Sequence, residues 1–420
     1  MMLTKTSNGY DNARLGFQRR DPHRPDAIFA VTSAAEVEEA VRYATEHDLH
    51  LAVQASGHGP GRGLDGGVLI ATRGFHQVTV DAEQRTAWIE AGATWREVLD
   101  ATAPYGLAPL SGSFPGLGAI PYTLGGGLGL MARRFGYAAD HVRRIELVTL
   151  DGVRRTADPD LFWALRGGGG NFGVVTGIEI ELFDVPTLYG GSLYFDVAEH
   201  PQVLQIWRQW TQTVPDHVTS GLSLVPLPDI QPVPEPIRGK YIAQISLAIT
   251  SEGEDLIKPL RAIGEPAMDT VGELPYAESG KIFNEPDRPD SFSSRNVLLS
   301  DLDPAALQTL PKLAGPEAPM RCVIAIRHLG GALAHEPAVP NAIGHRDAAY
   351  SLTVITPPEG DELQREILAP WQPATIGRLF NFNDAGIDLR EVYEPETFTR
   401  LTALRRQYDP ARRLQANHQL

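Results

Sequence analysis

The chain has 420 residues, which is enough for two separate hydrophobic cores. Its formal net charge of −15 argues against nucleic acid or an anionic membrane as a partner, because both reward clustered Lys and Arg. No apolar run is long enough for a transmembrane helix and the start lacks the apolar core of a secretory signal, so we expect a cytoplasmic protein. A single cysteine, Cys322, excludes an internal disulfide and any site built from several cysteines.

The first part of the chain alternates predicted strands and helices. Capping boxes predict helix starts at Ser33–Glu36 and Thr94–Glu97, and a short helix is expected at 160–166. The first helix and its flanking strands form a βαβ unit, and Asp151-Gly152 predicts a hairpin turn. The expected strands are 27–31, 50–53, 68–71, 78–81, 86–91, 144–150, 153–156 and 172–183.

The pattern changes after about residue 186, where proline becomes dense. Strands are expected at 192–197, 241–249, 323–326, 350–355 and 378–382, and helices at 201–213, 253–263, 360–368 and 395–407. The stretch 284–295 is predicted to be a mobile loop. This mixture favours an α+β domain with an antiparallel sheet.

Many of the 41 glycines gather in three clusters, at 56–61, 125–129 and 167–173. Glycine lets a backbone approach a ligand and direct N–H groups at phosphate oxygens, although tight turns explain any single cluster equally well. Three clusters in one region favour a bound dinucleotide. A Rossmann site is not indicated, because Gly125–Gly129 lies outside a βαβ unit and Asp140 follows too early to bind a ribose.

Together these segments resemble the FAD-linked oxidases of the vanillyl-alcohol oxidase and p-cresol methylhydroxylase (PCMH) fold. Within that fold, the berberine-bridge-enzyme-like branch with the 6-hydroxynicotine oxidases is most similar. The segments that carry the resemblance are 51–58, 122–129, 134–142, 160–173 and the ending Tyr408-Asp409-Pro410 with Asn417-His418. The resemblance implies a PCMH-type FAD-binding domain at 1–186, a substrate domain at 187–375 with an antiparallel sheet, and a segment 376–420 that returns to the FAD domain.

The resemblance also implies the cofactor residues. His58 is placed where relatives attach the 8α-methyl of FAD to a histidine, and Ser56, Gly57 and Gly59 would donate backbone N–H groups to the pyrophosphate. The other cofactor-binding residues expected are Leu117, Gly118, Tyr122, Thr123, Gly125, Gly126, Gly127, Gly129, Asp140, His141, Val142, Val174, Val175, Asn381 and Asn417.

Some relatives form a second flavin bond through a cysteine in a Gly-x-Cys-Pro segment. The aligned segment here is Gly112-Ser113-Phe114-Pro115, so we expect a single attachment, with Cys322 as a buried core residue. Three residues after Phe114, Leu117 stands where a Val in relatives goes with fast reaction with O₂. Leu117 therefore favours an electron acceptor other than oxygen.

The substrate chemistry is less specific. Relatives use a tyrosine in the segment aligned with Phe380–Asn383, but both aromatic residues here are Phe. The candidates that remain for a catalytic group are Arg327, His328, Tyr350 and Tyr137. We expect hydride removal from a small alcohol or amine, with natural-product tailoring as its setting. The alternatives are a flavin-bound cyclase without net oxidation and a non-catalytic flavin protein.

Overall fold

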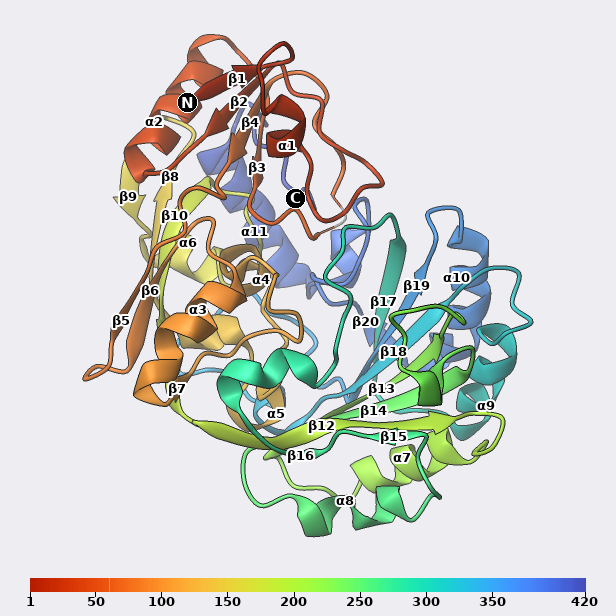
Figure 1. The fold of residues 1–420 in the computed structure, drawn as a ribbon. Helices are drawn as coiled ribbons and strands as arrows, with labels where there is room; N and C mark the ends of the chain where they lie inside the picture. The colour runs from red at the N-terminus through yellow and green to blue at the C-terminus, as the bar shows by residue number, and fades with distance from the viewer. Residues whose placement is uncertain (60) are drawn as a thin grey trace.

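The N-terminal part of the chain is built on two small sheets (Figure 1). The computed structural model describes residues 1–59 and 61–420, so Pro60 of the first glycine cluster lies outside the described residues. The first sheet has the strand order β1-β2-β4-β3, and the second has the order β5-β6-β10-β8-β9. Their bounds are β1 Met2–Thr4, β2 Ala27–Ala30, β3 Leu51–Gln54, β4 Val68–Ala71, β5 Val78–Asp81, β6 Thr86–Glu90, β8 Val142–Val148, β9 Arg154–Thr156 and β10 Val174–Glu181.

The predicted βαβ unit is present, with one more strand inside it. Helix α2 (Ala34–Glu46) begins after Ser33, whose side chain accepts a hydrogen bond from the Glu36 N–H. Its apolar face, which includes Val37 and Val41, packs on the first sheet. Strands β2 and β3 are parallel, but both pair with β4, which lies between them.

The short helices of this part lie against the two sheets and the loops beside them. They are α1 Tyr10–Arg14, α3 Trp95–Thr102, η1 Ala103–Tyr105, α4 Ala119–Leu124, α5 Ala132–Phe135, η2 Ala138–His141 and α6 Pro159–Ala164. A two-stranded ribbon joins β7 Leu107–Ala108 to β11 Phe183–Asp184. Helix α3 begins at the predicted capping box, where the Thr94 N–H donates to a Glu97 carboxylate oxygen at 2.6 Å. The hairpin turn is also confirmed, since Gly152 has a φ of +75° between β8 and β9.

From Thr187 onward the described residues form a sheet of nine strands, all paired antiparallel. The strands are β12 Thr187–Asp196, β13 Val218–Pro226, β14 Tyr241–Ile249, β15 Met268–Asp269, β16 Gly272–Pro275, β17 Ser293–Leu299, β18 Val323–His328, β19 Tyr350–Thr356 and β20 Thr375–Gly377. The sheet confirms the predicted α+β class, although the exact domain boundaries remain predictions.

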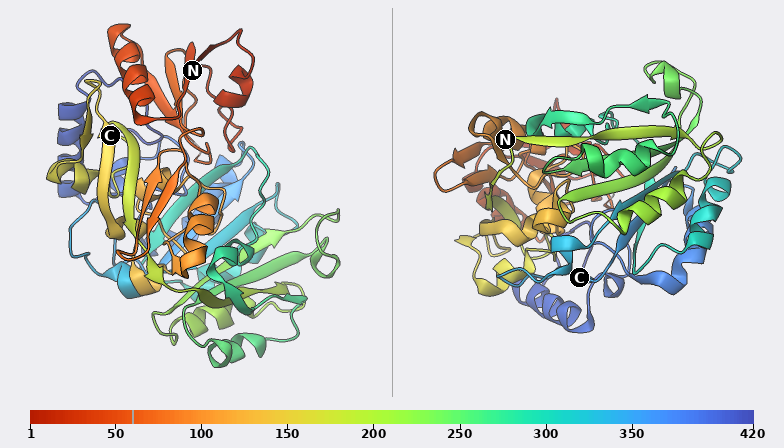
Figure 2. Two further views of the ribbon diagram at one scale, coloured as in Figure 1. Left: turned by 60° about the vertical axis from the view of Figure 1, so that its left-hand side comes forward. Right: turned by 90° about the horizontal axis from the view of Figure 1, so that it is seen from below.

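The two faces of this sheet differ in polarity. One face packs on helices and forms an apolar core with residues such as Ile324, Ile326 and Leu352. Figure 2 shows these helices on the side of the sheet away from the N-terminal part. They are α7 Val203–Thr211, α8 Glu254–Arg261, α9 Pro304–Leu313 and α10 Asp361–Leu368. Because side chains alternate along a strand, the other face carries the intervening residues, among them Asn296, Arg327 and Thr353. We call it the inner face.

The remaining short turns connect these elements. They are η3 Glu235–Ile237, η4 Tyr276–Lys281, η5 Gly331–Ala334, η6 Ala369–Ala374 and η7 Leu389–Glu391. Helix α11 (Pro395–Tyr408) then packs against α6 of the N-terminal part (Figure 1). The C-terminal segment runs beside β3, and the Gln415 N–H donates to the Leu51 carbonyl at 2.7 Å. None of the helices described is long and apolar enough to span a bilayer.

One strand expected in the second half is absent from the described residues. Residues 378–382 are not a strand, because side chains bind their backbone groups: Asn296 Oδ1 accepts from the Leu379 N–H at 3.0 Å, and Asn383 Nδ2 donates to the Leu379 carbonyl at 2.7 Å. Phe382 has a φ of +67°, which no strand allows. The expected loop 284–295 lies outside any helix or strand up to residue 292, and its last three residues belong to β17, which pairs with both β19 and β20.

Candidate active site

His58 lies in the loop after β3, against two aromatic rings that also contact each other. The centroid of its ring is 4.3 Å from that of Phe17 and 5.2 Å from that of Phe114. Burial lowers the pKa of His58, and the Glu285 carboxylate partly opposes this effect. Its Nδ1 is buried without a hydrogen-bond partner among the described residues. The structure therefore holds a neutral imidazole with one nitrogen that the protein leaves unpaired.

The loop that carries His58 is packed closely by backbone. Gly57 has a φ of +63°, and a Cβ there would lie 2.4 Å from the Gly16 Cα, so only glycine fits. Ser56 Oγ accepts a hydrogen bond from the Gly118 N–H at 3.1 Å, which joins the two predicted cofactor segments. Asn417 lies against the same loop, since a Cβ on Gly59 would be 2.8 Å from its Nδ2.

The Gly125–Gly129 turn follows α4 and has two residues in the left-handed region. Gly126 and Gly127 have φ values of +105° and +79°. Their carbonyls accept hydrogen bonds from the N–H groups of Ala139 and Ala138, each at 2.9 Å. A Cβ on Gly125 would come within 2.2 Å of Asn381 Oδ1, and Asn381 Nδ2 donates to the Tyr122 carbonyl at 3.1 Å. The predicted residues of this segment and Asn381 are thus brought together.

The polar side chains of several other predicted cofactor residues already have protein partners. The Thr123 hydroxyl donates to the Ala119 carbonyl at 2.8 Å within its own helix. Asp140 forms a buried ion pair with Arg346 at 2.7 Å. His141 bonds Glu181 through Nδ1 at 2.8 Å and the Phe135 carbonyl through Nε2 at 2.6 Å. These side chains therefore hold loops in place.

The remaining predicted cofactor residues contribute apolar packing. Val142 and Val175 lie in the largest N-terminal core, while Val174 faces the core under α2. Leu117 is partly buried against the largest core. Tyr122 is buried with its hydroxyl unpaired among the described atoms, and burial raises its pKa above the usual range.

His328 and Tyr350 lie on the helix-covered face of the large sheet, which argues against their predicted catalytic role. They are opposite each other on β18 and β19, with ring centroids 5.6 Å apart. The Tyr350 hydroxyl bonds Thr211 of α7 at 2.7 Å. His328 Nε2 is 3.0 Å from Arg133 Nη1, and burial, followed by the Arg133 charge, lowers the His328 pKa to about 3. Because Arg133 only donates, Nε2 accepts and the proton is on Nδ1.

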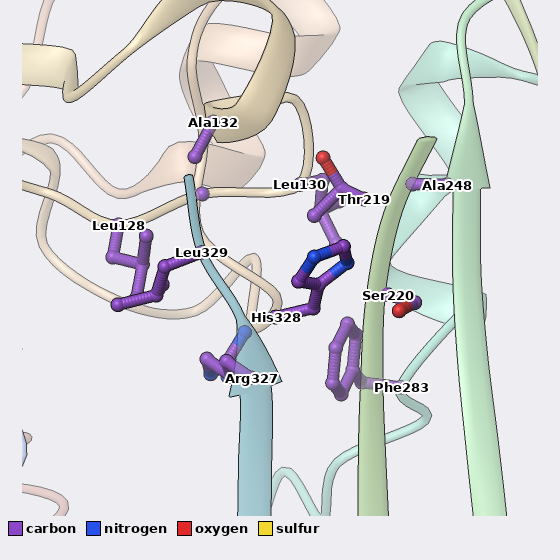
Figure 3. A pocket seen from close by; sticks show the side chains of 11 residues that line it. Leu128, Leu130, Ala132, Thr219, Ser220, Ala248, Phe283, Arg327, His328 and Leu329 are labelled. Carbon is purple, nitrogen blue, oxygen red and sulfur yellow. The ribbon is translucent and has the colours of Figure 1, made fainter. Parts of the chain in front are cut away.

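A small cavity lies beside His328 (Figure 3). Its volume is about 10 Å³, which accommodates one water molecule. His328 Nδ1 and Ser220 Oγ are buried polar atoms without partners among the described residues, and both residues line this cavity. Tyr137, the last catalytic candidate, is buried in a separate cluster, and burial raises its pKa to about 12.

Arg327 is the one predicted catalytic residue that reaches the surroundings of His58. Its side chain leaves β18 in a different direction from that of His328 (Figure 3). Arg327 Nη2 donates to Ser113 Oγ at 3.1 Å, next to Phe114, which stacks on His58. Ser113 Oγ in turn donates to Glu285 Oε1. Sequence reasoning missed Ser113 and Glu285, because nothing local marks a serine in a turn or a glutamate in a proline-containing loop.

Comparisons with known proteins identify the cofactor class and the fold. Residues 25–158 match the family model described as FAD binding domain. The chain is 27% identical over 448 residues to (R)-6-hydroxynicotine oxidase of Paenarthrobacter nicotinovorans, covering 98% of this chain and 94% of that protein. It is 26% identical to the uncharacterized FAD-linked oxidoreductase YgaK of Bacillus subtilis, covering 97% of this chain and 94% of that protein.

Solved structures show the same fold. The 6-hydroxy-D-nicotine oxidase of Arthrobacter nicotinovorans superimposes with a TM-score of 0.83 at 24% identity, covering 98% of this chain and 96% of that one. The wild-type BBE-like 1 protein of Physcomitrella patens gives a TM-score of 0.82 at 20% identity, covering 98% of this chain and 95% of that one. The chain is therefore an FAD-linked oxidoreductase with an FAD binding domain, and it shares the PCMH-type fold of these 6-hydroxynicotine oxidase and BBE-like structures.

Proposed function

We propose that the protein holds FAD through one covalent bond to His58 and removes a hydride from a small alcohol or amine, in natural-product tailoring. The observation that carries the attachment is the buried His58 Nδ1, which has no partner among the described residues. Desolvation keeps the imidazole neutral, and only the neutral ring is a nucleophile. The glycine loops around it provide the close backbone approach that a dinucleotide needs.

A structural relative suggests why the attachment would be single. The glucooligosaccharide oxidase of Acremonium strictum holds its FAD through both a cysteinyl and a histidyl link. In this chain Phe114 occupies the segment where we place the cysteine, and its ring stacks on His58. Cys322 is buried in the core of the large sheet, and burial raises its thiol pKa to about 12, so it offers no thiolate.

The protein residues have distinct tasks in this proposal. Bound FAD would supply the hydride acceptor. The backbone of Ser56–Gly59 would hold the pyrophosphate, and the 125–129 turn with Asn381 would hold the ring. Arg327 and the neighbouring phenylalanines would position the substrate from the inner face of the sheet. O₂ or another acceptor would then take the electrons.

Acid precipitation tests the attachment. Flavin should stay with the precipitated polypeptide, and His58→Ala should lose it to the supernatant. Complete release of FAD from the wild type would contradict the covalent bond. An anaerobic screen of alcohols, amines and hydroxylated pyridines tests the reaction: substrate-dependent bleaching of the flavin supports oxidation, whereas product formation without bleaching would favour a cyclase.

A further inference from the structure

Arg327 is only partly buried, and its contacts differ from those of the fully buried arginines. Arg133, Arg166, Arg346 and Arg405 each donate to, or pair with, at least three acceptors. Among the described residues Arg327 has a single acceptor, Ser113 Oγ. A guanidinium carries five N–H donors. Most of the Arg327 N–H groups therefore have no acceptor among the described residues and can bind water or a ligand.

The Arg327 guanidinium lies against two aromatic rings. Its Cζ lies 4.7 Å from the centroid of Phe283 and 5.3 Å from that of Phe382. Removal from water lowers the Arg327 pKa, and the Glu285 carboxylate opposes this effect. The N–H groups lie along the edge of the planar guanidinium, and the rings pack close to this group. A planar guanidinium with apolar neighbours is suited to a carboxylate, because a carboxylate accepts two parallel N–H hydrogen bonds from it.

Glu285 offsets the positive charge of Arg327 but accepts no hydrogen bond from the Arg327 guanidinium. Its carboxylate accepts from the Ser113 hydroxyl, and the described residues show no direct Arg327–Glu285 ion pair. Ser113 thus separates the two charges and orients both. Glu285 repels any further negative charge, so a ligand with one carboxylate is favoured at Arg327 over a ligand with two.

We infer that Arg327 binds a carboxylate of the substrate, so that the enzyme acts on an alcohol or amine that also carries one carboxylate group. This inference rests on the proposed function and specifies its substrate class. The anion would lie on the inner face of the sheet, on the side of Arg327 that faces the segment 113–114 and His58. Arg327 is a binding residue in this assignment and transfers no proton.

Binding of benzoate to the holoenzyme, compared with its neutral isostere benzamide, tests this site by calorimetry. The wild type should bind benzoate at least tenfold more tightly. Arg327→Gln should abolish the preference, Arg327→Lys should keep part of it, and Glu285→Gln should strengthen benzoate binding by removing a like charge. Arg321→Gln is the matched control, because Arg321 is exposed just before β18 and should leave both affinities unchanged.

Several outcomes would overturn the inference. These are equal binding of benzoate and benzamide, no benzoate binding at millimolar concentration, and unchanged benzoate binding in Arg327→Gln. A change in flavin absorbance or potential in Arg327→Gln with unchanged benzoate binding would assign Arg327 to the cofactor instead. The binding assay needs no turnover, so it is independent of the bleaching and acid-precipitation tests. Those two tests can fail while the carboxylate site stands.

Discussion

Arg327 and His328 are consecutive residues of β18, yet their side chains lie on opposite faces of the large sheet. Arg327 reaches Ser113 in the N-terminal part, at 3.1 Å. His328 contacts Arg133 and stacks on Tyr350, above the core under α7. A single step along the strand therefore separates a residue that faces the candidate site from one that supports the sheet.

The two positions should respond differently to mutation. His328→Ala should leave the anaerobic rate of flavin reduction within about twofold of wild type, because the imidazole does not face the site, a difference of under 1 kcal/mol in the barrier. It should lower the free energy of unfolding by about 1–3 kcal/mol, because Arg133 loses a buried acceptor. Stopped-flow reduction and urea unfolding measure the two effects. A tenfold slower reduction in a folded variant would restore His328 as a catalytic candidate.

Stability should fall in mild acid partly because of His328. Its pKa is about 3 in the folded protein, against 6.5 for the free side chain. Between these values the unfolded chain binds more protons than the native state, so the contribution of neutral His328 is complete above pH 6.5 and is lost as the pH falls toward 3.

His328→Gln isolates this effect. Glutamine retains a carbonyl that accepts from Arg133 but does not titrate. Urea unfolding at several pH values should therefore show a shallower loss of stability from pH 7 to 4 in the variant than in the wild type. Identical slopes would mean that folding does not lower the pKa of His328.

The buried Asp140–Arg346 pair should be a strong stabilising element. Asp140 is 7% exposed and Arg346 6% exposed, and Asn341 and the Tyr137 N–H also bind the carboxylate. Asp140→Asn leaves the guanidinium buried without its counter-charge, which typically costs about 3–5 kcal/mol. Asp388→Asn in the exposed Arg390 pair is the control and should cost about 0–1 kcal/mol. Equal losses in denaturant unfolding would contradict a special role for the buried pair.

Leu117 should slow the reaction of reduced flavin with O₂. Its side chain is partly buried against the largest core, one residue before Gly118, whose N–H bonds Ser56. Removal of one methylene opens space in a tightly packed region. Leu117→Val should therefore accelerate reoxidation by air in stopped flow, with an unchanged rate of anaerobic reduction. A wild type that already reoxidises as fast as the variant would rule out a gate at this position.

The sequence alone was sufficient to predict those features that depend only on residues close together along the chain. The capping boxes at Ser33 and Thr94, the Asp151-Gly152 turn and the glycine clusters were all readable, because caps and left-handed turns are set by a few consecutive residues. The resemblance placed His58 and the FAD-binding segments for the same reason: each is a continuous motif. The short strand expected at 378–382 failed because side chains from Asn296 and Asn383 bind its backbone, and Asn296 comes from a distant strand.

Only the tertiary structure decided which polar groups meet. Ser113, Glu285 and Arg327 come from three segments far apart in the sequence, and their contact depends on the register of β18 in the large sheet. The same register places His328 on the opposite, helix-covered face of the sheet, because successive side chains of a strand alternate between faces. The chain sequence thus determined the cofactor class and the architecture through local motifs. The side chains that face the candidate site were decided by strand pairing, which is a long-range property that no local pattern records.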